Sequence, residues 1–312
     1  MIEHALKLEE EAYALEESAE WKQAEPRWRE ALAIFEAEEG SQHPDTANLL
    51  RVLANNLIHQ SRYREAEELA RRAVEIMDAV VHLVDGPEGK IIQVEALLVH
   101  GNVLRELARY PDAEVVLRRA LALSEPDLTD AMGGALNSLG IVYKYWGKYE
   151  EGERVYRRAL DIFTQLYGER SVQVATLYHN LGGLEHQRGQ FELAEEPARR
   201  AWEIRRELLG EKHPDVLADA CAYGGVLDGL GRTKESRPIY EGALEEFERV
   251  YGPEHFEVAA TLHNLAWVES ADGNRKAAEG YYQRALEIKQ RLLGPEHPEC
   301  ALTAGNLAAL GS

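Results

Sequence analysis

The sequence predicts an all-α solenoid, a stack of two-helix units repeated along the chain. Alanine, leucine, glutamate and arginine dominate the 312 residues, and these residues favour helices. A phrase close to Arg-Arg-Ala-Leu recurs at steps of 42, 47, 39, 42, 42 and 42 residues, with its alanine at Ala31, Ala73, Ala120, Ala159, Ala201, Ala243 and Ala285. Self-similarity at a period of this length is the signature of repeat architectures.

Seven copies and a partial eighth account for the whole chain. One helical hairpin cannot bury both of its faces, so successive copies must stack into one continuous core. We therefore expect a single domain over residues 1–312. Its repeats are approximately 1–42, 43–89, 90–128, 129–170, 171–212, 213–254 and 255–296, with a capping helix over 297–312.

Each copy contains two expected helices joined by a short break. The first helix carries a glycine or alanine, which follows a leucine in Leu53-Ala54, Leu139-Gly140, Leu181-Gly182 and Leu265-Ala266. The break comes seven residues after that small residue, at Ala19, Ser61, Ala108, Gly147, Gly189, Gly231 and Gly273. An aromatic residue opens the second helix in the first five copies, at Trp21, Tyr63, Tyr110, Tyr149 and Phe191, whereas Thr233 and Arg275 replace it later. Small residues on both helices let the backbones approach closely, which predicts an antiparallel hairpin.

A glycine–histidine phrase separates the repeats. We expect Gly168, Gly210, Gly252 and Gly294 to end the second helices in the left-handed conformation that glycine adopts at low cost. Proline then occupies the first turn of the next helix, where its missing N–H is not needed, at Pro44, Pro214 and Pro298. The histidine before each proline is interpreted as a structural linker residue. "DGPEGKII" at 85–92 replaces this phrase, so an irregularity is expected in the third repeat.

This layout resembles the tetratricopeptide repeat, in the long form found in kinesin light chains and many bacterial regulators. The segments "HPDTANLLRVLANNLIHQSRYREAEELARRAVEI" and "VAATLHNLAWVESADGNRKAAEGYYQRALEIKQRLLGPEHPE" carry the resemblance, which covers essentially the whole chain. It implies a right-handed superhelix in which the first helices line a concave groove. It also implies a non-enzymatic scaffold that holds an extended protein or peptide segment in that groove.

By the same resemblance, groove residues lie three and two positions before the small residue of each first helix, and one and four after it. In repeat six these positions hold Cys221, Ala222, Gly225 and Asp228. An asparagine can satisfy a peptide backbone because it offers both a donor and an acceptor. Asparagines facing solvent or bridging to a neighbouring helix are the alternative. The candidate peptide-binding residues are Arg51, Asn55, Asn102, Arg105, Asn137, Lys144, His179, Asn180, Gly183, His186, His263, Asn264, Trp267 and Asn306.

Arg51 and Asn55 also resemble part of a chaperone-type carboxylate clamp. The clamp is incomplete, because Val99, Gly134 and Ser138 stand where its other polar and basic residues belong. We therefore do not expect the acidic C-terminus of a chaperone as the ligand.

Two other functions stay open at the level of the sequence. One is a regulatory sensor that binds a small peptide or metabolite. The other is an enzyme that uses the histidines and glutamates of repeats five to seven. In these repeats Glu185 and Glu269 occupy positions where the repeat usually has an aromatic residue. Pairing with a nearby arginine, such as Arg188 for Glu185, is the simpler explanation. No zinc-protease motif, phosphate loop or G-x-S-x-G occurs, so no catalytic residue, metal or cofactor is expected.

The composition limits the classes of partner that the chain is expected to bind. A net charge of −20 argues against nucleic acid, whose binding depends on neutralising phosphates, and favours protein partners with basic segments. The two cysteines cannot build a disulfide framework, and with no signal peptide the cytoplasm is the expected location. No apolar run reaches the roughly 18 residues of a membrane span, so no membrane partner is expected. A homo-oligomer stays open.

Overall fold

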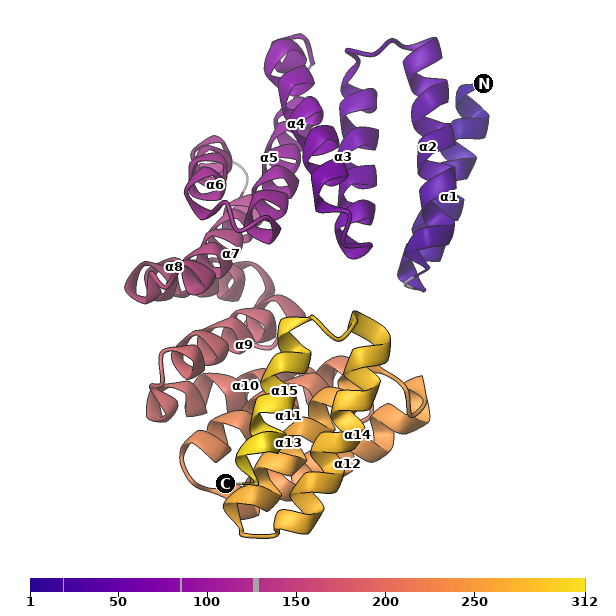
Figure 1. Ribbon diagram of the computed structural model, residues 1–312. Coiled ribbons are helices and arrows are strands. Elements are labelled where there is room, and N and C mark those ends of the chain that lie inside the picture. The colour runs from indigo at the N-terminus through magenta and orange to yellow at the C-terminus, as the bar shows by residue number, and fades with distance from the viewer. Residues whose placement is uncertain (19, 85, 126–128, 312) are drawn as a thin grey trace. The chain divides into compact units, whose positions relative to one another are not determined.

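The computed structural model describes residues 1–18, 20–84, 86–125 and 129–311. Within these ranges it contains fifteen α-helices, one 3-10 helix and no strand (Figure 1). None of the helices in this part of the chain is long and apolar enough to cross a membrane. The elements are α1 (Ile2–Glu17), α2 (Trp21–Glu38), α3 (Pro44–His59), α4 (Tyr63–Val80), η1 (Val81–Leu83), α5 (Glu88–Glu106), α6 (Tyr110–Ser124), α7 (Thr129–Trp146), α8 (Tyr149–Tyr167), α9 (Val172–Gln187), α10 (Phe191–Leu209), α11 (Pro214–Gly229), α12 (Thr233–Tyr251), α13 (Phe256–Ala271), α14 (Arg275–Leu293) and α15 (Pro298–Ala309).

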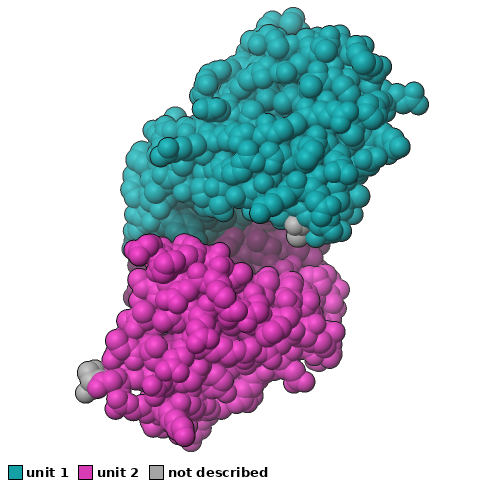
Figure 2. Space-filling model, turned by 45° about the vertical axis from the view of Figure 1, so that its right-hand side comes forward, with its two compact units in different colours: residues 1–162 teal, residues 163–312 magenta. Residues whose placement is uncertain are grey.

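The chain divides into two compact units, residues 1–162 and 163–312 (Figure 2). The division falls inside α8, between Ile162 and Phe163. Unit 1 contains α1 to α7 and most of α8, and unit 2 contains the end of α8 and α9 to α15. A single uninterrupted solenoid domain over residues 1–312 stays a prediction.

Consecutive helices pack as the predicted hairpins. In unit 1, α1 packs on α2, α3 on α4 and α5 on α6; in unit 2, α9 packs on α10, α11 on α12 and α13 on α14, with α15 covering α14. The first helices of neighbouring hairpins also contact one another, α9 with α11 and α11 with α13. The predicted all-α solenoid of antiparallel hairpins is confirmed.

The small residues of the first helices permit this close packing. A Cβ added to Gly182 in α9 would lie 3.0 Å from the backbone nitrogen of Ala198 in α10. In the next hairpin, a Cβ on Gly224 would lie 2.8 Å from the buried ring of Tyr240. Glycine at these positions therefore makes room for a backbone in one hairpin and for an aromatic ring in the next.

The breaks within the hairpins lie where the sequence predicts them. Gly147, Gly189, Gly231 and Gly273 all have a positive φ, and each second helix begins two residues later. Ser61 and Ala108 take the same conformation without being glycine, with φ of 59° and 56°. Ala19, the corresponding residue of the first repeat, lies outside the described residues.

The linkers between hairpins differ from expectation in one respect. Gly210 follows α10 with φ 83° and ψ 155°, so it is not left-handed helical as predicted. Gly252 and Gly294 have similar angles, with ψ of 169° and 152°. Such a combination is essentially restricted to glycine, so these residues are needed for an extended exit that reverses the chain.

The linker histidines have the structural role that the sequence indicates. His43, His213, His255 and His297 each precede a first helix, and their Nδ1 atoms accept the backbone N–H two residues later at 3.2–3.3 Å. This bond satisfies one of the donors that every helix N-terminus leaves unpaired. The irregular third linker has no such cap: η1 follows α4, and α5 begins after Pro87.

Candidate functional site

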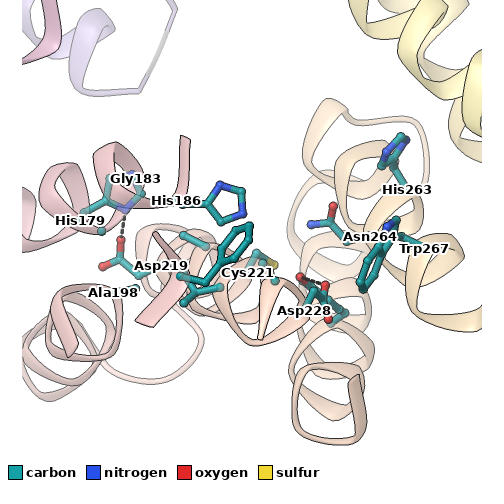
Figure 3. Close-up of a pocket in the computed structure, with 17 residues that line it drawn as sticks. His179, Gly183, His186, Ala198, Asp219, Cys221, Asp228, His263, Asn264 and Trp267 are labelled. Atoms are coloured by element: carbon teal, nitrogen blue, oxygen red, sulfur yellow. Dashed lines mark hydrogen bonds and ion pairs between the residues drawn. The ribbon is translucent and has the colours of Figure 1, made fainter. Parts of the chain in front are cut away.

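A pocket of about 520 Å³ opens on the first helices of unit 2 (Figure 3). We refer to it as the groove pocket. Its walls come from three successive first helices and from the two second helices behind them. The lining residues are His179, Gly182, Gly183 and His186 of α9, Phe191 and Ala198 of α10, Asp219, Cys221, Ala222, Gly225, Val226, Asp228 and Gly229 of α11, Tyr240 of α12, and His263, Asn264 and Trp267 of α13.

The lining largely coincides with the groove positions predicted for repeats five to seven. Three of the four predicted positions in α9 and in α13, and all four in α11, line the pocket. Asn180 and Ser270 are the exceptions. The structure therefore brings the predicted residues of three repeats together, while their role in binding stays a prediction.

Two glycines at groove positions line the pocket without contributing a side chain. Gly183 and Gly225 occupy the groove position directly after the small residue, where α7 has Ile141 and α13 has Trp267. A Cβ on Gly225 would lie 3.6 Å from Nε2 of His186, at van der Waals contact, so a small side chain would fit here but would take up part of the pocket. Trp267, 39% exposed, closes the far end with an apolar surface.

A buried ion pair lies where α9, α10 and α11 meet at the edge of the pocket. Nδ1 of His179 lies 2.7 Å from Oδ1 of Asp219, and the guanidinium of Arg205 donates to Oδ2 of Asp219 at 2.6 Å. Arg205 also donates to the hydroxyl of Thr176 at 3.0 Å. Because the Asp219 carboxylate requires a proton on Nδ1 of His179, Nε2 of a neutral His179 is left as an acceptor.

Asp228 lies in a different environment on the same helix. Its two carboxylate oxygens accept hydrogen bonds from the hydroxyls of Ser236 and Tyr240, the latter at 2.8 Å. Partial burial raises the pKa of Asp228 above its ordinary value, although these hydrogen bonds act in the opposite direction. No lysine or arginine in the described part of the chain forms an ion pair with it.

Two further titratable groups of the lining are uncharged at neutral pH. Burial lowers the pKa of His263 to about 4, and the cation of Lys289 adds to that effect. Nδ1 of His263 lies 3.0 Å from the hydroxyl of Thr303, and Asn306 donates to Nε2 at 3.2 Å. Burial raises the pKa of the Cys221 thiol to about 12, so this side chain is a protonated thiol.

Other side chains of the lining are available to a ligand. The amide of half-buried Asn264 makes no hydrogen bond to a described residue, and His186 is exposed, with its ring edge-on to Phe191 at 5.3 Å. Figure 3 shows His186 on α9 and Asn264 and Trp267 on α13 pointing into the pocket from opposite sides. Hydrogen-bonding and apolar surface therefore face one space.

Two candidates of unit 2 lie elsewhere. Asn306 of α15 is engaged with His263 and does not line the pocket, which agrees with the alternative that such asparagines bridge neighbouring helices. Asn180 is half-buried beside the lining residue His179.

The remaining candidates belong to unit 1. Arg51 donates to Asn48 at 2.8 Å and lies 3.3 Å from the carboxylate of Glu95. Arg105 and Lys144 lie 6.0 and 5.1 Å from the centre of the Tyr145 ring. Half-buried asparagines accompany these cations at the predicted positions: Asn55 on α3, Asn102 on α5 and Asn137 on α7.

The two glutamates that suggested an enzyme do not line the groove pocket. Both are buried, and Glu185 lies 3.9 Å from the guanidinium of Arg188, as the simpler interpretation predicts. Glu269 pairs with Arg237 and accepts a hydrogen bond from Asn274 at 2.7 Å. Among the described residues, no group of three or more His, Cys, Asp or Glu side chains is arranged to hold a metal ion.

The polar contacts beside the pocket, such as Arg205 with Asp219, were not predicted from the sequence, although the repeat period could have indicated them. Two repeats after Arg205 and Asp219 stand Lys289 and Thr303, and two repeats after His179 stands His263. Nζ of buried Lys289 lies 3.2 Å from the Thr303 hydroxyl, so the arrangement recurs with other residues. The sequence pattern that indicates such a contact is a basic residue followed, 14 positions later, by a polar residue.

Comparison with solved structures identifies the same fold. BtubC (BKLC) from P. vanneervenii is 24% identical, with a TM-score of 0.64 over 76% of this chain and 94% of that one. A putative kinesin light chain with nearly identical TPR-like repeats, from Podosopora anserina, is 17% identical, with a TM-score of 0.56 over 67% and 99%. The apo form of RapI is 15% identical, with a TM-score of 0.67 over 92% and 98%. At these identities the likeness concerns the fold alone.

A search of curated proteins found no match. A family model for the tetratricopeptide repeat matches residues 3–79, 132–207 and 218–291, well over half of the chain. This match confirms the resemblance seen in the repeats. The chain belongs to the tetratricopeptide repeat family.

Proposed function

We propose that this chain is a non-enzymatic scaffold that binds an extended peptide segment of a partner protein across α9, α11 and α13. One observation carries the proposal: the groove positions of three successive repeats converge on one pocket. Its volume of about 520 Å³ lies within the range of roughly 300–1,000 Å³ usual for ligand sites.

The chemistry of the lining supports a peptide as the ligand. The Asn264 amide makes no hydrogen bond to a described residue and can both donate to and accept from a peptide backbone. Trp267 supplies exposed aromatic area, the kind of surface that dominates binding energy at interfaces.

The same lining argues against catalysis by the obvious candidates. Cys221 is a protonated thiol, which is a poor nucleophile, and both nitrogens of His263 face polar groups of α15. Glu185 and Glu269 are held by arginines outside the pocket. The net charge of −20 supports partners with basic segments, and the two free thiols support a cytoplasmic setting.

The proposal is tested by selecting random peptides, displayed on phage, on the full chain and measuring the affinity of enriched peptides by calorimetry. Asn264→Ala and Trp267→Ala should each weaken binding about tenfold or more, because truncating a central anchor commonly costs about 2 kcal/mol. Gln283→Ala, an exposed side chain of α14 outside the pocket, is the control and should leave the affinity unchanged.

Equal affinity for all variants, or no enriched peptide, would refute a peptide-binding groove. A peptide-dependent change in the radius of gyration from small-angle scattering would instead identify the regulatory sensor.

A further inference from the structure

In the described part of the chain, one carboxylate of the groove pocket, that of Asp228, forms no ion pair with a lysine or arginine. Asp219 also lines the pocket, but its charge is compensated by Arg205, and it accepts a hydrogen bond from His179. The hydrogen-bond partners of Asp228 are two neutral hydroxyls, those of Ser236 and Tyr240, and the basic side chain that acts on it electrostatically is the imidazole of His186. Each carboxylate oxygen can accept two hydrogen bonds, so each has one acceptor site to spare.

From this imbalance we infer that Asp228 makes the groove pocket select peptides that place a lysine or arginine side chain beside it. The inference deepens the proposed function and rests on it. A partly buried carboxylate without a counter-charge is costly, and a cation brought by the ligand removes that cost.

The rest of the lining suits the aliphatic stem and the charge of such a side chain. Trp267, Phe191 and Val226 give the pocket apolar walls, and Figure 3 shows the Trp267 ring near Asp228. Lysine and arginine bury their methylene stems against such surfaces, and an indole ring attracts their cations. A glutamate side chain would meet the Asp228 carboxylate instead.

The same groove position varies in charge along the chain. Asp228 lies four residues after the small residue of α11, and the corresponding position is Arg105 in α5, Lys144 in α7 and His186 in α9. The position is therefore cationic in α5 and α7 but apolar in α3, where it is Ile58, whereas α11 presents an anion. The selectivity is thus a local property of the α11 repeat and does not follow from the overall acidity of the chain.

The test uses the peptides enriched on the full chain, resynthesised with each lysine replaced by norleucine and each arginine by citrulline. Asp228→Asn removes the charge but can still hydrogen-bond Ser236 and Tyr240. Asp215→Asn removes the same charge from an exposed position of the same helix, outside the pocket, and is the matched control. An unchanged melting temperature of both variants by circular dichroism establishes that the fold is intact.

The expected result is a lysine or arginine at a fixed position in the enriched peptides. Its neutral replacement should weaken binding to the wild type about tenfold or more, but leave binding to Asp228→Asn nearly unchanged. The loss reflects the cost of leaving one member of a desolvated pair alone. Asp215→Asn should bind the original peptides within about twofold of wild type.

The inference is overturned by peptides that require Trp267 for binding yet contain no basic residue, or by equal affinity of Asp228→Asn and wild type for the lysine peptides. Either outcome leaves the proposed peptide groove in place. Peptides whose affinity is insensitive to both Trp267→Ala and Asn264→Ala overturn the proposed function, and this inference with it.

Discussion

The buried pair of Asp219 and Arg205 offers a stringent test of how the repeats of unit 2 are held together. Replacing Asp219 by alanine removes the acceptor of two bonds, from Arg205 at 2.6 Å and from His179 at 2.7 Å. Asp219 is 1% exposed and Arg205 is 8% exposed, so water cannot easily take the place of the lost carboxylate. The arginine would be left as a buried cation without a counter-charge.

The magnitude follows from that uncompensated charge. Removing one partner of a buried ion pair costs about 3–5 kcal/mol, whereas exposed single pairs are worth less than about 1 kcal/mol. We expect Asp219→Ala to lower the free energy of unfolding by about 3 kcal/mol, the lower end of that range, because the hydroxyl of Thr176 remains as a partner of Arg205 at 3.0 Å. Asp215→Ala, an exposed change on the same helix, should cost less than about 0.5 kcal/mol.

The next repeat of the chain provides a matched rescue. Phe247 and Thr261 occupy the positions that correspond to Arg205 and Asp219, and both are buried. The double variant Arg205→Phe with Asp219→Thr places the same two uncharged residues at the corresponding positions one repeat earlier. Because well-packed apolar groups often replace buried ion pairs without loss, the double variant should recover to within about 1 kcal/mol of wild type.

Urea unfolding followed by circular dichroism measures the global effect. Hydrogen exchange of the α10 and α11 amides measures the local one, which matters because repeat proteins can open in parts. A cost below about 1 kcal/mol for Asp219→Ala would refute the reasoning. So would a double variant less stable than Asp219→Ala, because the penalty would then not come from the unpaired arginine.

Three further predictions concern unit 2. Since the folded pKa of His263 is about 4 and lies below its unfolded value, its contribution to stability is complete above pH 6.5 and is lost as the pH falls through 4. His263→Asn should therefore lose about 1–2 kcal/mol less free energy of unfolding than the wild type between pH 7 and pH 4.5, because the side chain is partly exposed and its charge is partly screened. Urea unfolding at each pH measures this, and an equal pH dependence of the two proteins would contradict it. The Cys221 thiol, with a pKa of about 12, should react with iodoacetamide at pH 8 at least about 100-fold more slowly than a free cysteine; labelling at the free rate in mass spectrometry would contradict the raised pKa. Gly210→Ala should cost about 1–3 kcal/mol because of its positive φ, whereas Gly242→Ala, in helix α12 with open space around it, should stabilise by up to about 1 kcal/mol; equal melting temperatures would contradict the assignment.

The hairpins could be predicted from the sequence because their signals are local and repeated. A break such as Gly189 and a helix start such as Phe191 depend on a few neighbouring residues, and seven copies reinforce each position. The linker glycines illustrate the limit of such reasoning. Their positive φ was predictable, but the ψ of 155° at Gly210 was not, because glycine is permitted in both conformations at that φ.

The groove positions were predictable for the same reason, but the contacts behind them were not. His179 and Asp219 are 40 residues apart and meet only because α9 packs on α11. Their pairing with Arg205 depends on distances between three helices, which the repeat pattern alone does not fix. Asn306 shows the same limit, since it occupies an asparagine position of the repeat yet bonds to His263.

The departures from the repeat pattern explain the site better than the pattern itself. An ordinary groove position provides a side chain, whereas Gly183 and Gly225 line the pocket between α9 and α11 without one. Trp267, at the same position one repeat later, closes that cavity. The fold therefore requires only that the hairpins stack, and the residues left free by stacking can differ from repeat to repeat. A carboxylate at Asp228, where α7 carries Lys144, is such a difference, and it is where we expect specificity to reside.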